Sequence, residues 1–147
     1  GDLADNAGPV YSPRQFRQYV MPRFKQLIDY CHELRMPYIF RTDGNTRPLW
    51  NIFQELGVDG LGEIDAQAGM NLKEIREFFG DRFVLYGNID CAKTLVYGTK
   101  HQIENEVRHC IDDGKPCHIL SSSNCIHYNV PAVNYMYMLD AIHKFKF

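Results

Sequence analysis

The chain has 147 residues, of which 45% are hydrophobic and 23% are charged, and its formal net charge is −2. Such a composition is that of a globular domain, and the length suffices for one domain with its own core. The weak acidic charge gives a nucleic-acid partner no electrostatic support, and no apolar run reaches the roughly 18 residues of a membrane helix. The five cysteines have no CxxC spacing, which favours reduced thiols in the cytoplasm over disulfides or structural zinc.

The first predicted helix begins at Ser12, where an N-cap serine is followed by proline at the first helical position and glutamine at the third. Apolar residues recur at helical spacing to about Leu34. Pro22 lies inside this pattern and predicts a kink or two abutting helices. Residues 1–5 are typical of the end of a strand that begins upstream, so we expect the chain to be a fragment.

Four later segments change from apolar to polar within a few residues, and a helical pattern follows each of them. They are residues 37–46, 60–65, 83–90 and 117–124. We expect a buried strand in each, with helices over about 46–56, 72–79, 92–97 and 99–113 and a last helix from Pro131. Thr46 is expected to cap the first of these helices, and Asn71 and Glu74 to form a capping pair at the second.

Strand and helix therefore alternate four times, without a hairpin signal such as Asn-Gly, which predicts a parallel sheet. In such a sheet, polar groups at the carboxyl ends of the strands gather on one side, where sites lie in barrels and in open sheets. No GxGxxG or GxxxxGK motif follows a strand, so a dinucleotide or nucleoside triphosphate site is disfavoured. A (β/α)8 barrel needs about 250 residues, and four units are half of one.

The first candidate site residues lie at the ends of the first two of these strands. Arg41 could grip a carboxylate, and Asp43 points to the same side of an extended backbone, but an Arg41–Asp43 pair that orders a loop explains both equally well. Glu63 and Asp65 could perform acid–base chemistry or hold a polar substrate, although solvated acids at a strand end are common.

Further candidates follow the last two strands. Asn88 and Asp90 come after Gly87, whose own explanation is a sharp turn or a close approach of a ligand. Residues 121–127 are rich in hydrogen-bond donors and could cradle an anion, although His127 alone is more often a satisfied surface histidine. The six histidines are scattered without ligand spacing, so no metal site is predicted. The coincidence of polar groups on four strand ends is what indicates a site.

With these residues in view, the chain resembles the C-terminal half of the uroporphyrinogen decarboxylase superfamily. The matching pieces are GDLADNAGPVYSPRQFRQYVMPRFKQLID, the strand that ends in DGN, ELGVDGL, GDRFVLYGNID, GTKHQIENEVRHCID and SSSNCIHYNVPAVNYMYMLDAI. They cover nearly the whole chain in order. The resemblance implies an α/β fold, the C-terminal half of a (β/α)8 TIM barrel, as a partial domain over residues 1–147. It also implies that an N-terminal half, with the arginine-rich motif and essential aspartate of the decarboxylase, is missing.

The superfamily also contains corrinoid-dependent methyltransferases. Those that act on thiols bind zinc through His-x-Cys and a later Cys, at positions that match Arg41, Asp43 and Asn124, and Cys125 is one residue away from the last position. The resemblance therefore argues against a thiol acceptor. The decarboxylase usually has histidine at the position of Asn124, and the tail is more similar to members found beside corrinoid proteins in ether-demethylating anaerobes.

The first hypothesis is thus a cytoplasmic methyltransferase whose barrel mouth receives a cobamide (corrinoid) carried by a partner protein, with no tightly bound cofactor. The other substrate would be a pterin or a methoxylated small molecule, and the fragment alone is expected to be inactive. The expected catalytic residues are Asp43, Glu63 and Asn124. The expected substrate-binding residues are Asp2, Asp5, Asn6, Arg41, Asn45, Asp65, Asn88, Asp90, Ser122 and His127.

Three alternatives stay open. One is cofactor-free decarboxylation of a tetrapyrrole, in which arginines hold propionates and an upstream aspartate drives protonation. Another is a half-barrel binding module, which would hide its open sheet edges by pairing with the missing half or with a copy of itself. The last is a degenerate member that keeps the fold without the activity.

Overall fold

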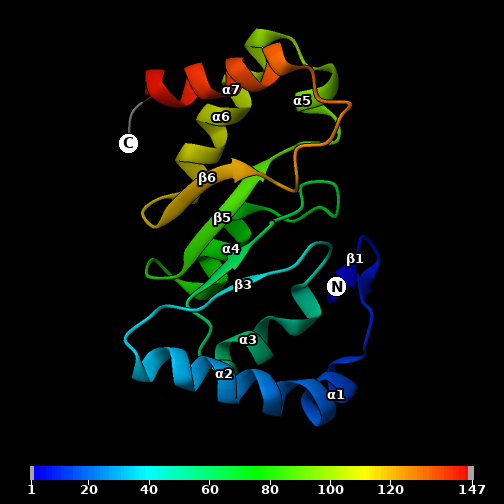
Figure 1. The fold of residues 1–147 in the computed structure, drawn as a ribbon, viewed down its shortest axis with the longest axis vertical. Coiled ribbons are helices and arrows are strands. Elements are labelled where there is room, and N and C mark those ends of the chain that lie inside the picture. Colours follow the sequence, from blue (N-terminus) through cyan, green and yellow to red (C-terminus); the bar gives the residue numbers. More distant parts are fainter. Residues whose placement is uncertain (1, 146–147) are drawn as a thin grey trace.

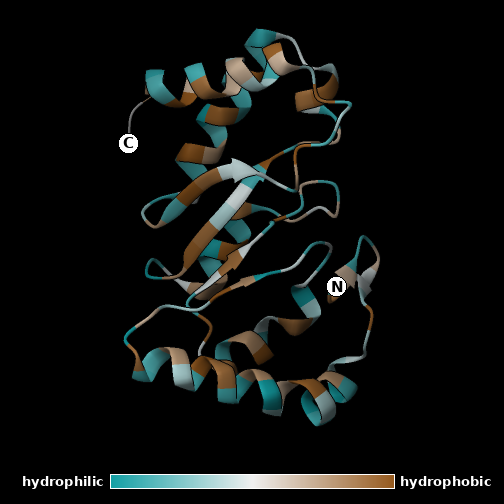
Figure 2. Cartoon of the chain, in the orientation of Figure 1, coloured by the Kyte–Doolittle hydropathy of each residue, from teal (hydrophilic) through white to brown (hydrophobic). Residues whose placement is uncertain are grey.

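The computed structural model describes residues 2–145 of the chain. Its centre is a parallel sheet of four strands in the order β3 (Ile39–Arg41), β4 (Gly60–Gly62), β5 (Val84–Ile89) and β6 (His118–Ser122) (Figure 1). The predicted parallel sheet is confirmed, although each strand is shorter than the segment in which it was expected. In Figure 2 the arrowhead of β6 is near neutral in colour after a hydrophobic stretch, which matches the change seen in the sequence.

Helices alternate with the strands, as predicted. They are α1 (Pro13–Gln15), α2 (Met21–Glu33), α3 (Trp50–Leu56), α4 (Leu72–Phe79), α5 (Thr94–Tyr97), α6 (Lys100–Gly114) and α7 (Ala132–Phe145). A π-helix, η1 (Phe16–Val20), joins α1 to α2, and a 3-10 helix, η2 (Arg47–Leu49), precedes α3. None of the helices in residues 2–145 is long and apolar enough to cross a membrane.

The predicted helix starts are mostly confirmed. Ser12 and Gln15 form a complete capping box, and the π-helix before Pro22 is the predicted irregularity. Thr46 lies at the N-cap position of η2, which leads into α3, but its side chain makes no capping bond, and its hydroxyl instead accepts a 3.1 Å hydrogen bond from the Trp50 indole. At α4, Asn71 caps the backbone of Glu74, but the Glu74 carboxylate is used elsewhere.

The small antiparallel hairpin of β1 (Ala4–Asp5) and β2 (Gly8–Pro9) was not predicted from the sequence. The Asp5 carboxylate makes its turn by accepting hydrogen bonds from the backbone N–H groups of Ala7 and Gly8, at 2.8 and 3.0 Å. The hairpin packs against the loop after β3, where a Cβ on Gly44 would come within 2.6 Å of the Ala4 backbone. Residues 2–5 are therefore part of the site region.

The helices cover one face of the sheet. On that face Phe40, Leu61 and Leu85 form a row across β3, β4 and β5 and are buried. The next row, on the opposite face, contains Arg41, Gly62, Tyr86 and Ile119, and Ile119 is 47% exposed. The open face corresponds to the interior of a closed barrel.

Arg76 stabilises the end of the sheet at which the strands begin. Its buried guanidinium donates hydrogen bonds to the backbone carbonyls of Gly80, Phe83, Gly114 and Cys117, at 2.6–2.8 Å. One side chain thus ties the end of α4, the approach to β5, the end of α6 and the approach to β6. This end of the sheet therefore contributes to stability, whereas the carboxyl end can carry a site.

Candidate active site at the carboxyl ends of the strands

The loops after the two outer strands of the sheet meet at Asp43 and Asn124. The Asn124 side-chain nitrogen donates a 2.5 Å hydrogen bond to one Asp43 oxygen, and the Gly44 N–H donates a 3.0 Å bond to the other. The Asn124 side-chain oxygen accepts a 2.6 Å bond from the Cys125 N–H, which orients the amide with its nitrogen toward Asp43. Two of the three predicted catalytic residues are therefore in direct contact.

The surroundings of Asp43 favour its protonated form. Partial burial raises the pKa of its carboxyl, and the nearby carboxylates of Asp65 and Asp2 raise it further, against a lowering by the Gly44 N–H. Asp2 also accepts a 3.3 Å hydrogen bond from the backbone of Asp43. A carboxyl whose pKa is raised by burial and like charges is typical of a general acid or base.

Arg41 does not pair with Asp43, so the loop-ordering pair considered from the sequence is wrong. Its guanidinium lies 2.5 Å from a Glu63 carboxylate oxygen, and its central carbon lies 5.4 Å from the centre of the Tyr86 ring. Glu63 has φ +58°, a left-handed conformation that is costly for a residue with a side chain and that is concentrated at functional sites. The Arg41–Glu63 pair lies on the open face of the sheet, where the two opposite charges neutralise each other.

Several other residues predicted for the site use their side chains for hydrogen bonds to backbone groups of nearby loops. The Asp90 carboxylate accepts hydrogen bonds from the N–H groups of Ala92 and Lys93, at 2.8 and 2.9 Å. Asn88 donates to the Ile64 carbonyl at 2.7 Å, and the Ser122 hydroxyl donates to the Asn124 carbonyl at 2.7 Å. These contacts shape the loops that carry the site.

The remaining predicted residues have local roles too. His127 bonds through one ring nitrogen to the Cys91 carbonyl at 3.0 Å and accepts from the Asn129 N–H at 3.3 Å, as a satisfied surface histidine does. Asn45 accepts from the backbone of Arg47, Asp5 builds the hairpin turn, and Asn6 is exposed in that turn. Asp65 is buried and accepts from the Gln67 N–H at 2.8 Å.

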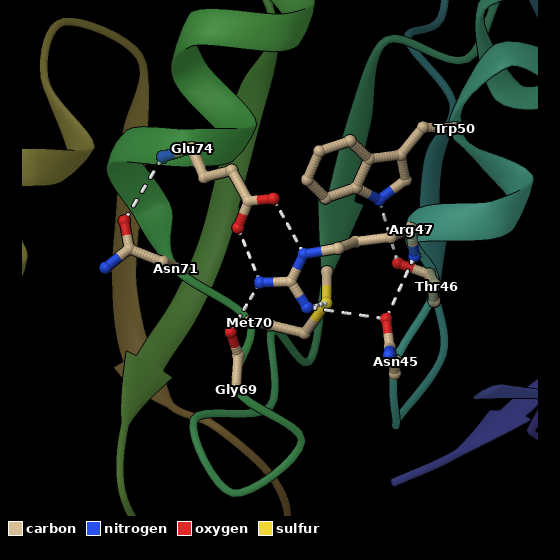
Figure 3. Close-up of polar contacts among 8 residues, drawn as sticks. All are labelled: Asn45, Thr46, Arg47, Trp50, Gly69, Met70, Asn71 and Glu74. Carbon is tan, nitrogen blue, oxygen red and sulfur yellow. Dashed lines mark hydrogen bonds and ion pairs between the residues drawn. The ribbon is translucent and has the colours of Figure 1, made fainter. Parts of the chain in front are cut away.

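Two charged residues near the site were not singled out from the sequence. Arg47, at the start of η2, forms a two-bond ion pair with Glu74 on α4 (Figure 3). Glu106 accepts a 2.6 Å bond from the Asp90 N–H, and burial raises the pKa of its carboxyl. Both lie on helices, where the sequence pattern indicates a solvated charge, and only the fold shows their partners.

A separate cleft of about 480 Å³ lies between α5 and α6, and its lining includes Lys93, Tyr97, Glu106 and His109. It is lined by none of the residues predicted for the site. The strand-end cluster around Asp43 is therefore identified by its hydrogen bonds and charges and not by an enclosed cavity.

The residues at the positions of the zinc ligands do not fit zinc. Arg41 is a cation paired with Glu63, and Asn124 directs an N–H donor, not a lone pair, toward Asp43. Within residues 2–145, no group of three or more His, Cys, Asp and Glu side chains could hold a metal ion.

A family model described as uroporphyrinogen decarboxylase (URO-D) matches residues 2–145. The chain belongs to the uroporphyrinogen decarboxylase family. It is 31% identical over 144 residues to the uroporphyrinogen decarboxylase of Geobacter sulfurreducens and 32% identical to that of Geotalea uraniireducens. These alignments cover 97% of this chain but 41% and 40% of the relatives, so the chain spans about two fifths of their length.

The fold of this family member also matches a solved structure. A methyltransferase from Methanosarcina mazei superposes with a TM-score of 0.73 at 22% sequence identity, over 98% of this chain and 40% of that protein. The match confirms the predicted fold, half of a TIM barrel. Both the family and the fold expected from the sequence are therefore confirmed.

Proposed function

We propose that the protein is a methyltransferase of the uroporphyrinogen decarboxylase family in which Asp43 holds and moves the proton of the reaction. The methyl group would pass between a corrinoid carried by a partner protein and a small molecule that is not strongly anionic. The observation that supports this most is the place of Asp43, which is half-buried near the carboxylates of Asp65 and Asp2 and accepts a hydrogen bond from the Asn124 amide. The corrinoid would supply the metal centre that carries the methyl group.

The role of Asp43 follows from the charge balance of methyl transfer. When a bond between a methyl group and an oxygen breaks, the electron pair stays on the oxygen, which then needs a proton. A protonated Asp43 would give its proton to that oxygen, and Asn124 would stabilise the carboxylate left behind. In the reverse direction Asp43 would take the proton from the acceptor.

The open face of the sheet suits a corrin ring, whose side chains are mostly amides. Tyr86 is half-buried and Ile119 is 47% exposed on this face, next to the acidic strand ends. These two residues would face the ring. Arg41, which we expected to orient an acidic group of the substrate, is neutralised by Glu63 and is not assigned that role.

Uroporphyrinogen decarboxylation is the second candidate, and the names of the relatives from Geobacter and Geotalea favour it. Its substrate carries many carboxylates. Asp2 and Asp65 lie close to Asp43 at the strand ends, and their negative charges would repel such a substrate. Decarboxylation would therefore depend on cations supplied from outside residues 2–145.

The experiment uses the full-length protein and compares two reactions. We expect it to bind cobalamin in a spectroscopic titration and to transfer methyl groups from methylcobalamin to a panel of oxygen and nitrogen acceptors. Asp43→Asn should lower this rate at least tenfold, whereas Asp29→Asn, in an exposed pair with Lys25 on α2, should not. Conversion of uroporphyrinogen to coproporphyrinogen without any methyl transfer would overturn the proposal in favour of the decarboxylase.

A further inference from the structure

Asp43 and Asp65 lie in different loops, after β3 and β4, and one side chain connects these loops. Arg47 follows Asp43 in the first loop and reaches across to the second (Figure 3). Its Nε lies 2.7 Å from one Glu74 oxygen, and one terminal nitrogen lies 2.5 Å from the other Glu74 oxygen and 2.6 Å from the Gly69 carbonyl. Such a two-bond ion pair fixes orientation as well as distance.

The Arg47 guanidinium also contacts neighbouring residues of its own loop and of α3. Asn45 accepts hydrogen bonds from the Arg47 backbone at 3.3 Å and from a terminal nitrogen at 3.4 Å. The central carbon lies 5.9 Å from the centre of the buried Trp50 ring, and Trp50 donates to Thr46. Arg47 is thus anchored in the first loop before it reaches the second.

The contact with Gly69 is transmitted to Asp65 through a compact turn. The Met70 N–H donates to the Asp65 carbonyl at 3.0 Å, and the Gly69 N–H donates to the Ala66 carbonyl at 3.1 Å. The Gln67 N–H donates to the Asp65 carboxylate at 2.8 Å. The hydrogen bond from Arg47 to the Gly69 carbonyl therefore restrains the whole turn, including the buried Asp65 side chain.

We propose that Arg47 is a positioning residue that keeps the Asp65 carboxylate close to Asp43. The Asp43 carboxyl is then kept protonated to a higher pH by the charge of Asp65, together with that of Asp2. A consequence for the reaction rate rests on the proposed function, in which Asp43 moves a proton. The effect on the titration of Asp43 does not rest on it, because no substrate is needed.

The chain offers a matched control. Arg17 forms the same kind of two-bond pair with Glu55, between η1 and α3 and on the exposed surface. Both pairs join an arginine to a glutamate on another element. If the loss of a two-bond ion pair acted only through the overall stability of the fold, Arg47→Met and Arg17→Met would have the same effect on the pKa of Asp43.

The test measures the pKa of Asp43 by NMR of the side-chain carboxyl carbons in wild type, Arg47→Met, Glu74→Gln and Arg17→Met. We expect Arg47→Met to lower the pKa of Asp43 clearly, Glu74→Gln to lower it less because the contact with Gly69 remains, and Arg17→Met to leave it unchanged. Arg47→Lys, which keeps one donor, should give an intermediate value.

An Asp43 pKa that is the same in Glu74→Gln, in Arg47→Lys and in wild type would overturn the proposal, even if Arg47→Met does not fold. An equal change in Arg17→Met would overturn it as well, since the effect would then not be specific to these loops. If the wild-type protein transfers no methyl group, the proposed function fails while the titration still decides the role of Arg47.

Discussion

The Asn124 amide donates a 2.5 Å hydrogen bond to the Asp43 carboxylate across 81 residues of sequence. The two residues follow β6 and β3, the outer strands of the sheet. The loops after these two strands therefore reach toward each other across the carboxyl end of the sheet. The bond thus joins the first and last strand ends into one site.

Loss of this bond should weaken both the fold and the site. We expect Asn124→Ala to lower the free energy of unfolding by about 1–2 kcal/mol, because a half-buried carboxylate loses a donor. The pKa of Asp43 should rise further, since the amide favours the charged form. Urea unfolding and NMR titration measure the two effects. Asn105→Ala, which removes an exposed side-chain contact with His101 on α6, is the control and should leave the pKa of Asp43 unchanged.

The charge of Asp65 should be felt directly at Asp43. Asp65→Asn removes a neighbouring negative charge but keeps an oxygen that can accept from the Gln67 N–H, so the pKa of Asp43 should fall. Asp5→Asn, in the hairpin turn, removes the same charge from a place that does not contribute to the shift and should have no such effect. Equal titration of Asp43 in Asp65→Asn and wild type would show that the two carboxylates do not interact.

His118 should make the free energy of unfolding depend on pH. Burial and the nearby Arg76 lower the pKa of its imidazole, while its bond to the Gly87 carbonyl, at 2.7 Å, raises it. Because the lowered pKa lets the unfolded chain bind a proton that the folded chain does not, stability falls as pH drops below about 6.5. His118→Gln keeps a donor for Gly87 but cannot titrate.

We therefore expect urea unfolding of His118→Gln to lose less stability than wild type between pH 7 and pH 5. His143→Gln, at an exposed position of α7, should keep the wild-type dependence. The same slope in His118→Gln and wild type would contradict the buried neutral imidazole.

Arg76 should contribute to stability and not to the reaction. Arg76→Met leaves several carbonyls without their donor and should cost about 3 kcal/mol in urea unfolding. Lys115→Met, which breaks an exposed pair with Asp112, should change little. The pKa of Asp43 should be the same in any folded Arg76→Met protein, and a shift would mean that the two ends of the sheet are coupled.

The alternation of strands and helices was readable from the sequence because each unit has its own hydrophobic pattern and caps. Ser12 with Gln15, and Thr99 with Gln102, act within one turn of chain, so their roles are visible locally. The polar groups at the strand ends were found for the same reason. The family and fold predicted from them are confirmed.

The partners of these polar groups were not readable, because they are fixed by long-range packing. Arg41 pairs with Glu63 across two strands and not with Asp43 in its own loop. Glu74 lies within a capping pattern, yet its carboxylate binds Arg47 27 residues away. The hairpin at residues 4–9 has no Asn-Gly signal, since a carboxylate side chain makes its turn.

The titration of Asp43 in the wild-type protein, by NMR of its carboxyl carbon, tests most directly whether the strand ends form a proton-holding site. We expect a pKa clearly above the ordinary value of about 3.9 for aspartate. A pKa at or below that value would contradict the role of Asp43 as the acid of this site and, with it, the proposed methyl transfer.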